Sequence, residues 1–438
     1  MLYDAYEFGR NWFAGASAAA SAGARWWSSP VNPLAATTIG ETASAALDVF
    51  AHAAAPRGKP AFGLPSTTID GREVRIHETI HAERPFGRLI RFERIGAGEG
   101  DPKLLIVAPM SGHYATLLRG TVERMLASHD VYITDWADAR MVPRSAGRFD
   151  LDDYIDYLIG WLEHLTPEGS PRTHMLAVCQ PSVPALAAAA LMAAADHPAR
   201  PCSLTMMGGP IDTRRAPTVV NRLAMERPLA WFRENVITTV PFHYPGAGRH
   251  VYPGFLQLAG FMSMNLGSHL SSHWAMFKDL VRGDGESAEA TKRFYEEYRS
   301  VCDMTAEFYL QTLVTVFKRH LLPRGEMVHR GTPVDPAAIR DIPLFAIEGE
   351  RDDISGLGQT RAALDIATSL KDSDRHYFMV PEVGHYGIFN GRRWRTIIAP
   401  RVEDFIRASA CSAAPLHGAG LHRAAIDLQP PDDSLEFA

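Results

Sequence analysis

The chain has 438 residues, of which 46% are hydrophobic and 21% charged, so it can bury a substantial core and is not intrinsically disordered. Its formal net charge of −6 argues against a broadly basic face for nucleic acid. The N-terminus lacks the cationic segment and apolar core of a secretory signal, and no apolar run approaches the ~18 residues that span a bilayer. The four cysteines have no paired spacing, so we expect no metal site and no cofactor, and a reducing, cytoplasmic setting.

Residues 1–60 are rich in alanine and aromatic side chains and form an expected N-terminal helical extension. We predict two or three helices there, broken at the Ser-Pro and Asn-Pro pairs of residues 29–30 and 32–33. The Pro-, Gly- and Lys-containing stretch 53–60 reads as a linker. Residues 74–80 and 88–92 then alternate apolar and polar side chains around a Pro-Phe-Gly break, which predicts an antiparallel hairpin.

Six short apolar runs follow and predict buried strands at residues 104–108, 131–135, 175–178, 202–207, 344–347 and 377–380. Helical patterns are expected between or beside most of them, at residues 114–128, 151–165, 183–195 and 360–370, with a last helix near 392–408. Continuous apolar strands alternating with helices predict a mostly parallel, doubly wound sheet with helices on both faces.

The gap between the fourth and fifth of these runs is too long for a simple connection. We interpret residues 213–333 as an inserted helical lid or cap subdomain, with helical segments at 219–232, 255–264, 272–281 and 288–317. The core then comprises residues 70–212 and 334–410, and residues 411–438 form a loose C-terminal tail.

The turn at Cys179 carries the strongest chemical signal. An apolar strand enters a tight turn there and a small-residue helix follows, which is the form of a nucleophile elbow. Cys179 occupies the place of serine in the usual G-x-S-x-G pattern, and Ala177 and Pro181 occupy the places of its two glycines. The N-terminal end of the following helix points at this turn and favours a thiolate.

Two further polar residues follow the strands that come later in the chain. Asp352 lies in Gly-Glu-Arg-Asp-Asp-Ile after residues 344–347, and His385 lies in Gly-His-Tyr-Gly after residues 377–380. The order Cys, Asp, His matches the nucleophile, acid, histidine order of α/β-hydrolases. We expect His385 to activate Cys179 and Asp352 to orient His385, while the competing Asp353 caps the next turn.

An oxyanion hole needs two N–H donors. The backbone N–H of Gln180 is expected to be one, because it follows the nucleophile. The loop after residues 104–108 should supply the other; Pro109 has no N–H, so Met110 is preferred and Ser111 is the alternative. Ser182 is interpreted as the cap of the helix after the elbow.

The remaining cysteines, Cys202, Cys302 and Cys411, are interpreted as small core hydrophobes. His113 either lines the cleft or is an ordinary loop residue, and it is not counted among the site residues. The aromatic and methionine side chains of the insertion could form an exposed patch for an apolar surface, but for most of them a place in the core is the preferred interpretation; they are Trp231, Phe232, Phe242, Tyr244, Tyr252, Phe255, Phe261 and Met262.

Several long segments resemble intracellular poly(3-hydroxybutyrate) depolymerases across nearly the whole chain. The segments are the opening Met-Leu-Tyr-Asp-Ala-Tyr-Glu and residues 106–119, 131–140, 177–182 and 384–394. The resemblance implies an α/β-hydrolase core with Cys179 as nucleophile, Asp352 as acid and His385 as base, a Cys-Asp-His set that is similar to that of polyhydroxyalkanoate synthases.

The resemblance also implies a substrate, which is amorphous storage polyester cut to 3-hydroxybutyrate oligomers or monomer. The expected partners are hydroxyacyl ester chains and the surface of a cytoplasmic storage granule, and no nucleic acid is expected. The sequence does not determine the oligomeric state, and a homodimer is one alternative. The alternatives are a synthase-like acyltransferase, a depolymerase that uses coenzyme A as acyl acceptor, and a non-catalytic granule-coat protein. The sequence leaves the acceptor, water or a thiol, open.

Overall fold

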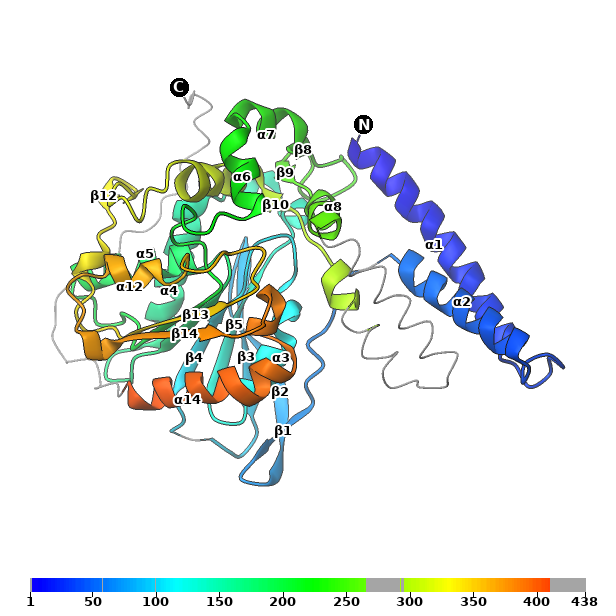
Figure 1. The fold of residues 1–438 in the computed structure, drawn as a ribbon, viewed down its shortest axis with the longest axis horizontal. Coiled ribbons are helices and arrows are strands. Elements are labelled where there is room, and N and C mark those ends of the chain that lie inside the picture. The colour runs from blue at the N-terminus through cyan, green and yellow to red at the C-terminus, as the bar shows by residue number, and fades with distance from the viewer. Residues whose placement is uncertain (1, 57, 99, 265–291, 293–294, 410–438) are drawn as a thin grey trace.

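A mixed sheet of nine strands forms the centre of the protein in the computed structural model (Figure 1). The structure describes all residues except 1, 57, 99, 265–291, 293–294 and 410–438. The strands of the sheet are β1 (Ser66–Ile69), β2 (Arg72–Arg84), β3 (Gly87–Arg94), β4 (Lys103–Val107), β5 (Asp130–Trp136), β6 (His174–Val178), β7 (Leu204–Met207), β13 (Leu344–Gly349) and β14 (Arg375–Val380).

The strand order is β1-β2-β3-β5-β4-β6-β7-β13-β14. The six strands from β5 to β14 in this order all pair in parallel, and β3 joins them antiparallel through β5. These six are the six apolar runs of the sequence, and β2 and β3 form the predicted hairpin. A doubly wound sheet with this order and this antiparallel strand is an α/β-hydrolase fold, so the predicted fold class is confirmed.

Helices cover both faces of the sheet. One face packs against α4 (Leu151–Leu165), α5 (Ser182–Ala194) and α12 (Ala362–Ile366), and the other against α3 (Arg119–Met125) and α14 (Ala399–Ala408). Strand side chains divide alternately between the two apolar clusters: Leu105 and Val107 lie in one, and Leu104 and Ile106 in the other. This alternation follows from the two-residue repeat of a strand and buries the parallel strands on both sides, except at the edge strand β14, where only Val380 is buried.

Several predicted helices of the core differ from the observed ones, and the helix predicted near 392–408 is a short helix, a π-helical turn and then α14. The segment expected to be one helix over 114–128 begins with a 3₁₀ turn, Ala115–Leu118, before α3. The helix expected over 360–370 is shorter and corresponds to α12, and the buried Glu348 carboxylate accepts the backbone N–H of Arg361, which precedes it, at 2.9 Å.

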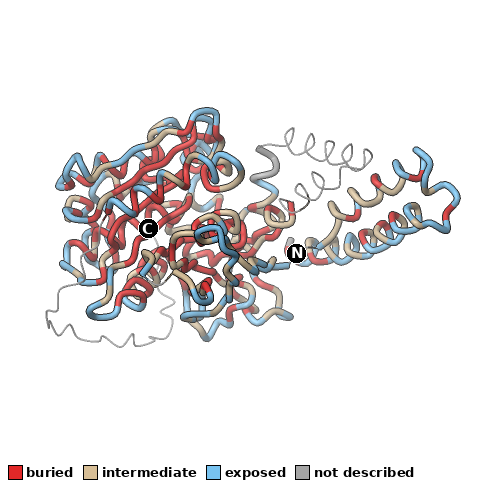
Figure 2. Tube along the Cα trace, turned by 90° about the horizontal axis from the view of Figure 1, so that it is seen from below, coloured by how far each residue is buried: buried red, intermediate tan, exposed pale blue. Residues whose placement is uncertain are grey.

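Two long helices precede the sheet and form a hairpin that projects from the body of the molecule (Figures 1 and 2). They are α1 (Leu2–Trp27) and α2 (Thr38–Ala54), separated by the Pro-containing turn that the sequence predicts. Thr37 caps α2 by accepting the N–H of Gly40 at 3.2 Å.

The segment between β7 and β13 contains more than the expected helices. Its described helices include α6 (Val219–Glu226), α7 (Leu229–Asn235), α8 (Gly254–Met264), α11 (Ala306–Thr312) and a π-helical continuation, Leu313–Lys318. Two small sheets are added by β8 (Thr238–Thr239), β9 (His250–Tyr252) and β10 (Met304–Thr305), and by β11 (Val328–His329) and β12 (Thr332–Pro333). Such short strands give no two-residue pattern for a sequence to reveal.

Pro228 divides the predicted helix 219–232 into α6 and α7, since proline lacks the N–H that a continuous helix requires. The predicted helix 272–281 and the tail 411–438 lie outside the described residues, as does the start of the predicted helix 288–317. No helix in the described part of the chain is long and apolar enough to cross a membrane.

The cysteines differ from expectation at one position. Cys202 is buried, as predicted, but it is disulfide-bonded, so its interpretation as a simple core hydrophobe is wrong. Cys179 and Cys302 are free thiols, and Cys411 lies outside the described residues. The sequence alone could not predict this disulfide bond, because the four cysteines have no characteristic spacing.

Candidate functional site

Cys179 stands at the apex of a strained turn between β6 and α5. Its φ angle is +67°, a left-handed conformation that a non-glycine residue adopts at a cost of about 1–2 kcal/mol. The turn is held because Cys179 donates its N–H to Met207 O at 2.7 Å and accepts from Ser182 N at 3.0 Å. This is the geometry of a nucleophile elbow, in which the side chain is presented at the end of the strand.

His385 and Asp352 meet at the same edge of the sheet. Nδ1 of His385 lies 2.7 Å from Oδ2 of Asp352, and both side chains are buried. The other carboxylate oxygen, Oδ1, accepts the backbone N–H groups of Ile354 and Ser355 at 2.9 and 2.8 Å. The carboxylate is therefore fixed by its own loop and directs one oxygen at the imidazole. Asp353, the competing acid of the sequence, is exposed.

Cys179 lies against the His385 ring and is the third of the predicted residues. Burial lowers the pKa of His385, but the Asp352 carboxylate and the adjacent Cys179 group, which is hydrogen-bonded to the ring, together raise this pKa well above its ordinary value. The imidazolium is thus stabilised between an acid and a sulfur. Such a set can take a proton from a thiol and return it to a leaving group.

A glycine makes room for this pair. Gly208 follows β7 with a φ angle of +60°, and a Cβ atom there would lie 3.0 Å from Cε1 of His385 and 3.3 Å from Oδ2 of Asp352. Any side chain would press on the imidazole and carboxylate. The sequence analysis missed this residue, although it stands directly after a predicted strand.

Glu348 is a second residue that the sequence analysis missed. It lies on β13 with its carboxylate buried, and it accepts from Gly358 N at 2.8 Å, from Arg361 N at 2.9 Å and from the Tyr377 hydroxyl at 2.8 Å. These bonds close the loop that carries Asp352. The sequence did contain a signal for Glu348, which is a charged residue in an otherwise apolar strand. A buried charge requires hydrogen-bond partners, so such a residue is expected to organise the groups around it.

The predicted oxyanion donor Met110 is engaged by a side chain. Its N–H donates to Oε1 of Gln180 at 3.2 Å, so the loop after β4 and the residue after Cys179 are joined directly. The amide nitrogen Nε2 of Gln180 is buried and has no hydrogen-bond partner among the described residues. A substrate oxygen could reach the Met110 N–H only after this amide moves.

Ser182 does not cap α5, contrary to the prediction. It is the first residue of the helix, and its hydroxyl is buried without a hydrogen-bond partner in the described part of the chain. Its side chain instead packs against Gly209, where a Cβ atom would overlap it. The short elbow requires this close approach, which overrides the capping preference of serine.

His113 is buried beside the site rather than in it. Its Nε2 lies 2.9 Å from the carbonyl oxygen of Tyr298, and burial lowers its pKa to about 4. Tyr298 in turn packs edge-on against Tyr386, the neighbour of His385, at 5.6 Å between ring centroids. Tyr298 therefore lies between the loop that follows β4 and the loop that carries His385.

The aromatic residues of the insertion mostly take the core places that the sequence analysis preferred. Phe232 is buried, and Trp231, Tyr244, Tyr252 and Phe255 are half-buried. Phe242 is the exception and is exposed. The side chains of Phe261 and Met262 lie outside the described residues.

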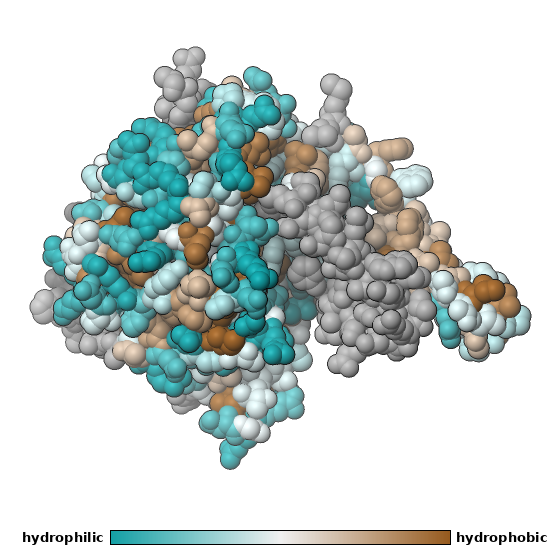
Figure 3. Space-filling view, in the orientation of Figure 1, coloured by the Kyte–Doolittle hydropathy of each residue, from teal (hydrophilic) through white to brown (hydrophobic). Residues whose placement is uncertain are grey.

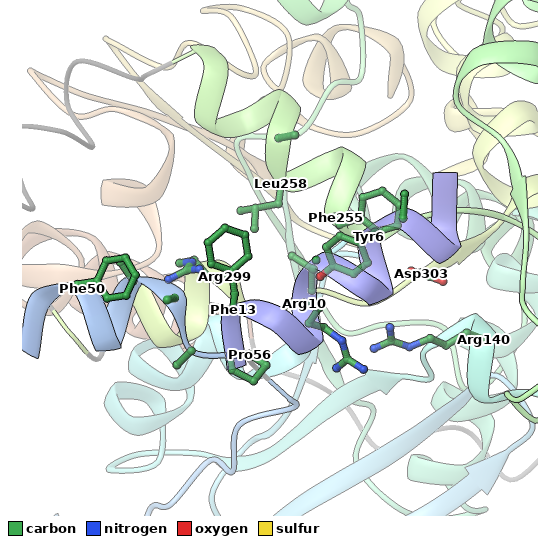
Figure 4. Close-up of a pocket in the computed structure, with 17 residues that line it drawn as sticks. Tyr6, Arg10, Phe13, Phe50, Pro56, Arg140, Phe255, Leu258, Arg299 and Asp303 are labelled. Carbon is green, nitrogen blue, oxygen red and sulfur yellow. The ribbon is translucent and has the colours of Figure 1, made fainter. Parts of the chain in front are cut away.

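A separate cavity of about 590 Å³ lies between α1, α2 and α8 (Figure 4). Aromatic rings of Tyr6, Phe13 and Phe50 line it together with the guanidinium groups of Arg10 and Arg140. None of the three residues Cys179, Asp352 and His385 lines this cavity. Within the described ranges, no group of three or more His, Cys, Asp or Glu side chains is placed to hold a metal ion.

Residues 208–410 match the family described as "PHB de-polymerase C-terminus". No curated protein matches the chain.

Solved structures with a similar arrangement include a putative lipase from Acinetobacter baumannii, with 12% identity, coverage of 76% of this chain and 93% of that one, and a TM-score of 0.39. A monoacylglycerol lipase from Paleococcus ferrophilus has 11% identity, coverage of 71% and 97%, and a TM-score of 0.42. A thermophilic esterase from Thermogutta terrifontis has 13% identity, coverage of 76% and 99%, and a TM-score of 0.39. At these scores the likenesses carry no weight for activity or substrate.

Proposed function

We propose that the protein hydrolyses intracellular poly(3-hydroxybutyrate) through an acyl-thioester on Cys179, and the match of residues 208–410 to the PHB depolymerase C-terminal family supports this choice of substrate. The observation that carries the proposal is the buried 2.7 Å contact between His385 and Asp352 beside a cysteine at a strained elbow. The substrate is the storage polyester of a granule, and the products are 3-hydroxybutyrate oligomers or monomer.

The chemistry follows from the positions of the three residues. The Cys179 thiolate attacks the ester carbonyl carbon, and the tetrahedral oxyanion forms near the backbone N–H groups of Gln180 and Met110, the latter once the Gln180 side chain has moved away from it. As the C–O bond breaks, the His385 imidazolium gives its proton to the departing alkoxide, which leaves as the hydroxyl end of the polymer. Asp352 keeps the imidazole oriented and balances its charge.

The second half returns the enzyme to its starting state. His385, now neutral, takes a proton from water as the water oxygen attacks the thioester carbon. The C–S bond breaks, the carboxylic acid leaves, and the Cys179 thiolate is restored beside the imidazolium. The net change is one ester and one water converted into one acid and one alcohol.

The test uses the purified full chain with amorphous poly(3-hydroxybutyrate) granules, with and without coenzyme A, and separately with 3-hydroxybutyryl-CoA. Acid release from granules in water, lost in Cys179→Ala, supports the proposal. Polymer formed from the thioester would replace it by a synthase-like acyltransferase, and release only with coenzyme A would replace it by a thiolytic depolymerase. Acid release by Cys179→Ala at the wild-type rate would overturn the mechanism. If no arm of the experiment showed turnover, the proposed activity would be wrong and a non-catalytic granule-coat protein would be the remaining alternative.

A further inference from the structure

The far end of the α1–α2 hairpin exposes large apolar side chains where a surface turn is normally polar. We call residues 26–40 the hairpin tip. Its exposed side chains are Trp26 (55% exposed), Val31 (85%), Leu34 (43%) and Ile39 (67%). In the space-filling view, hydrophobic atoms gather at this end of the projecting arm (Figure 3).

The hairpin tip carries no charge. No Asp, Glu, Lys or Arg lies between Arg25 and Glu41. Two of its polar side chains make hydrogen bonds within the tip: Oδ1 of Asn32 accepts the N–H of Leu34 at 3.1 Å, and the Thr37 hydroxyl donates to Leu34 O at 2.6 Å. The outward surface of the hairpin tip therefore carries no charge, and its exposed apolar side chains lie beside the exposed Ser28, Thr37 and Thr38.

The apolar surface continues from the hairpin tip along α1. Phe8 and Trp12 are exposed, and at 100° per residue they lie within about 40° of Trp26 around the helix axis. The opposite side of α1 packs on α2 through the buried Ala20 and Ala24. The aromatic face is thus directed away from the helix partner and is not needed for the hairpin to form.

The base of the hairpin is fixed to the body of the protein. The Tyr3 hydroxyl donates to Asp303 at 2.7 Å, and the Tyr244 hydroxyl donates to Glu7 at 2.8 Å. The hairpin is therefore an arm with an attached base and an uncharged, apolar tip that points away from the body of the protein (Figure 1).

We propose that the hairpin tip, residues 26–40, docks the enzyme on the apolar surface of amorphous polyester. The proposal rests on the proposed function for its choice of polymer. The charge of the hairpin favours an uncharged surface: residues 2–54 contain two arginines and four acidic residues, whereas helices that bind anionic lipid carry lysines and arginines on their polar face.

The test replaces three exposed side chains of the hairpin tip together, Trp26→Gln, Val31→Ser and Ile39→Thr. The matched control replaces three exposed apolar residues elsewhere, Ile80→Thr, Phe242→Ser and Val328→Ser. Binding is measured by co-sedimentation with amorphous poly(3-hydroxybutyrate) granules, and catalysis with both granules and a soluble 3-hydroxybutyrate oligomer. Circular dichroism verifies folding of both variants.

The expected result is at least a tenfold loss of granule binding and of granule hydrolysis in the tip variant, with kcat/KM for the soluble oligomer unchanged and with the control like wild type. Unchanged granule binding overturns the proposal. A change in the mass of the tip variant in light scattering also overturns the proposal, because the hairpin tip would then bind a second copy of the chain. Stronger binding of wild type to anionic phospholipid vesicles than to granules overturns it as well. If sedimentation depends on the tip but no ester is cleaved, the docking stands and the proposed function fails.

Discussion

Nδ1 of His385 and Oδ2 of Asp352 lie 2.7 Å apart in a buried contact, while Asp353, the next residue along the chain, is exposed. The backbone of the loop explains the difference, because Ile354 N and Ser355 N both donate to Asp352 and leave its second oxygen for the imidazole. Two adjacent carboxylates thus have different surroundings.

Asp352→Asn should lower kcat by about 10⁴-fold, because an amide that can donate a hydrogen bond favours the wrong imidazole tautomer. Asp353→Asn is the matched control and should stay within a few-fold of wild type. Steady-state hydrolysis of a soluble 3-hydroxybutyrate oligomer measures both. Equal losses in the two variants would contradict the assignment of Asp352.

The raised pKa of His385 makes its contribution to stability depend on pH. The folded protein holds the proton more tightly than the unfolded chain, so the stabilisation is fully present below the ordinary pKa of about 6.5 and is lost as the pH rises through the folded pKa. The free energy of unfolding lost in His385→Gln should therefore be largest near pH 6 and should shrink at alkaline pH. Urea unfolding across pH 6–10 measures this difference, with His376→Gln, an exposed histidine on β14, as control. A difference that grew with pH would refute the sign.

The bond from Met110 N to Oε1 of Gln180 predicts competition with substrate. If the Met110 N–H stabilises the oxyanion, Gln180→Ala frees this donor and should raise kcat/KM by about fivefold, the worth of one ordinary hydrogen bond. Gln180→Glu keeps an acceptor and should not show the gain. A fall in kcat of about 10²–10³-fold in Gln180→Ala would instead make the side-chain Nε2 the working donor.

Glu348 should act as a positioning residue for the Asp352 loop. Glu348→Ala leaves the N–H groups of Gly358 and Arg361 without their acceptor, so we expect a loss of about 2–3 kcal/mol in the free energy of unfolding and a fall in kcat with little change in KM. Glu348→Gln retains one acceptor oxygen and should recover part of kcat. Tyr377→Phe removes only the third bond and serves as the mild control. A Glu348→Ala enzyme with wild-type kcat would contradict the positioning role.

The doubly wound, mostly parallel sheet and the positions of the three candidate residues after its strands could be predicted because both follow from local sequence patterns, whereas the order of the strands could not. Apolar runs specify buried parallel strands, and polar residues directly after them must meet at one edge of the sheet. The engagement of Met110 by Gln180 could not be predicted, since it depends on a side-chain conformation across two loops. The close fit of Ser182 against Gly209 likewise depends on the distance between two backbones, which no single-residue preference encodes.

Alkylation of the cysteines should separate Cys179 from Cys302. Cys179 is partly accessible and lies beside the imidazolium of His385, whereas Cys302 is buried and burial raises the pKa of its thiol well above the ordinary value. Iodoacetamide reacts with thiolates, so it should label Cys179 first in the native protein and abolish turnover in proportion to that label. Peptide mass mapping of time points measures the order, and His385→Ala should slow labelling at Cys179 without changing Cys302. Equal rates at both cysteines in the native protein would show that Cys179 is not an activated thiol.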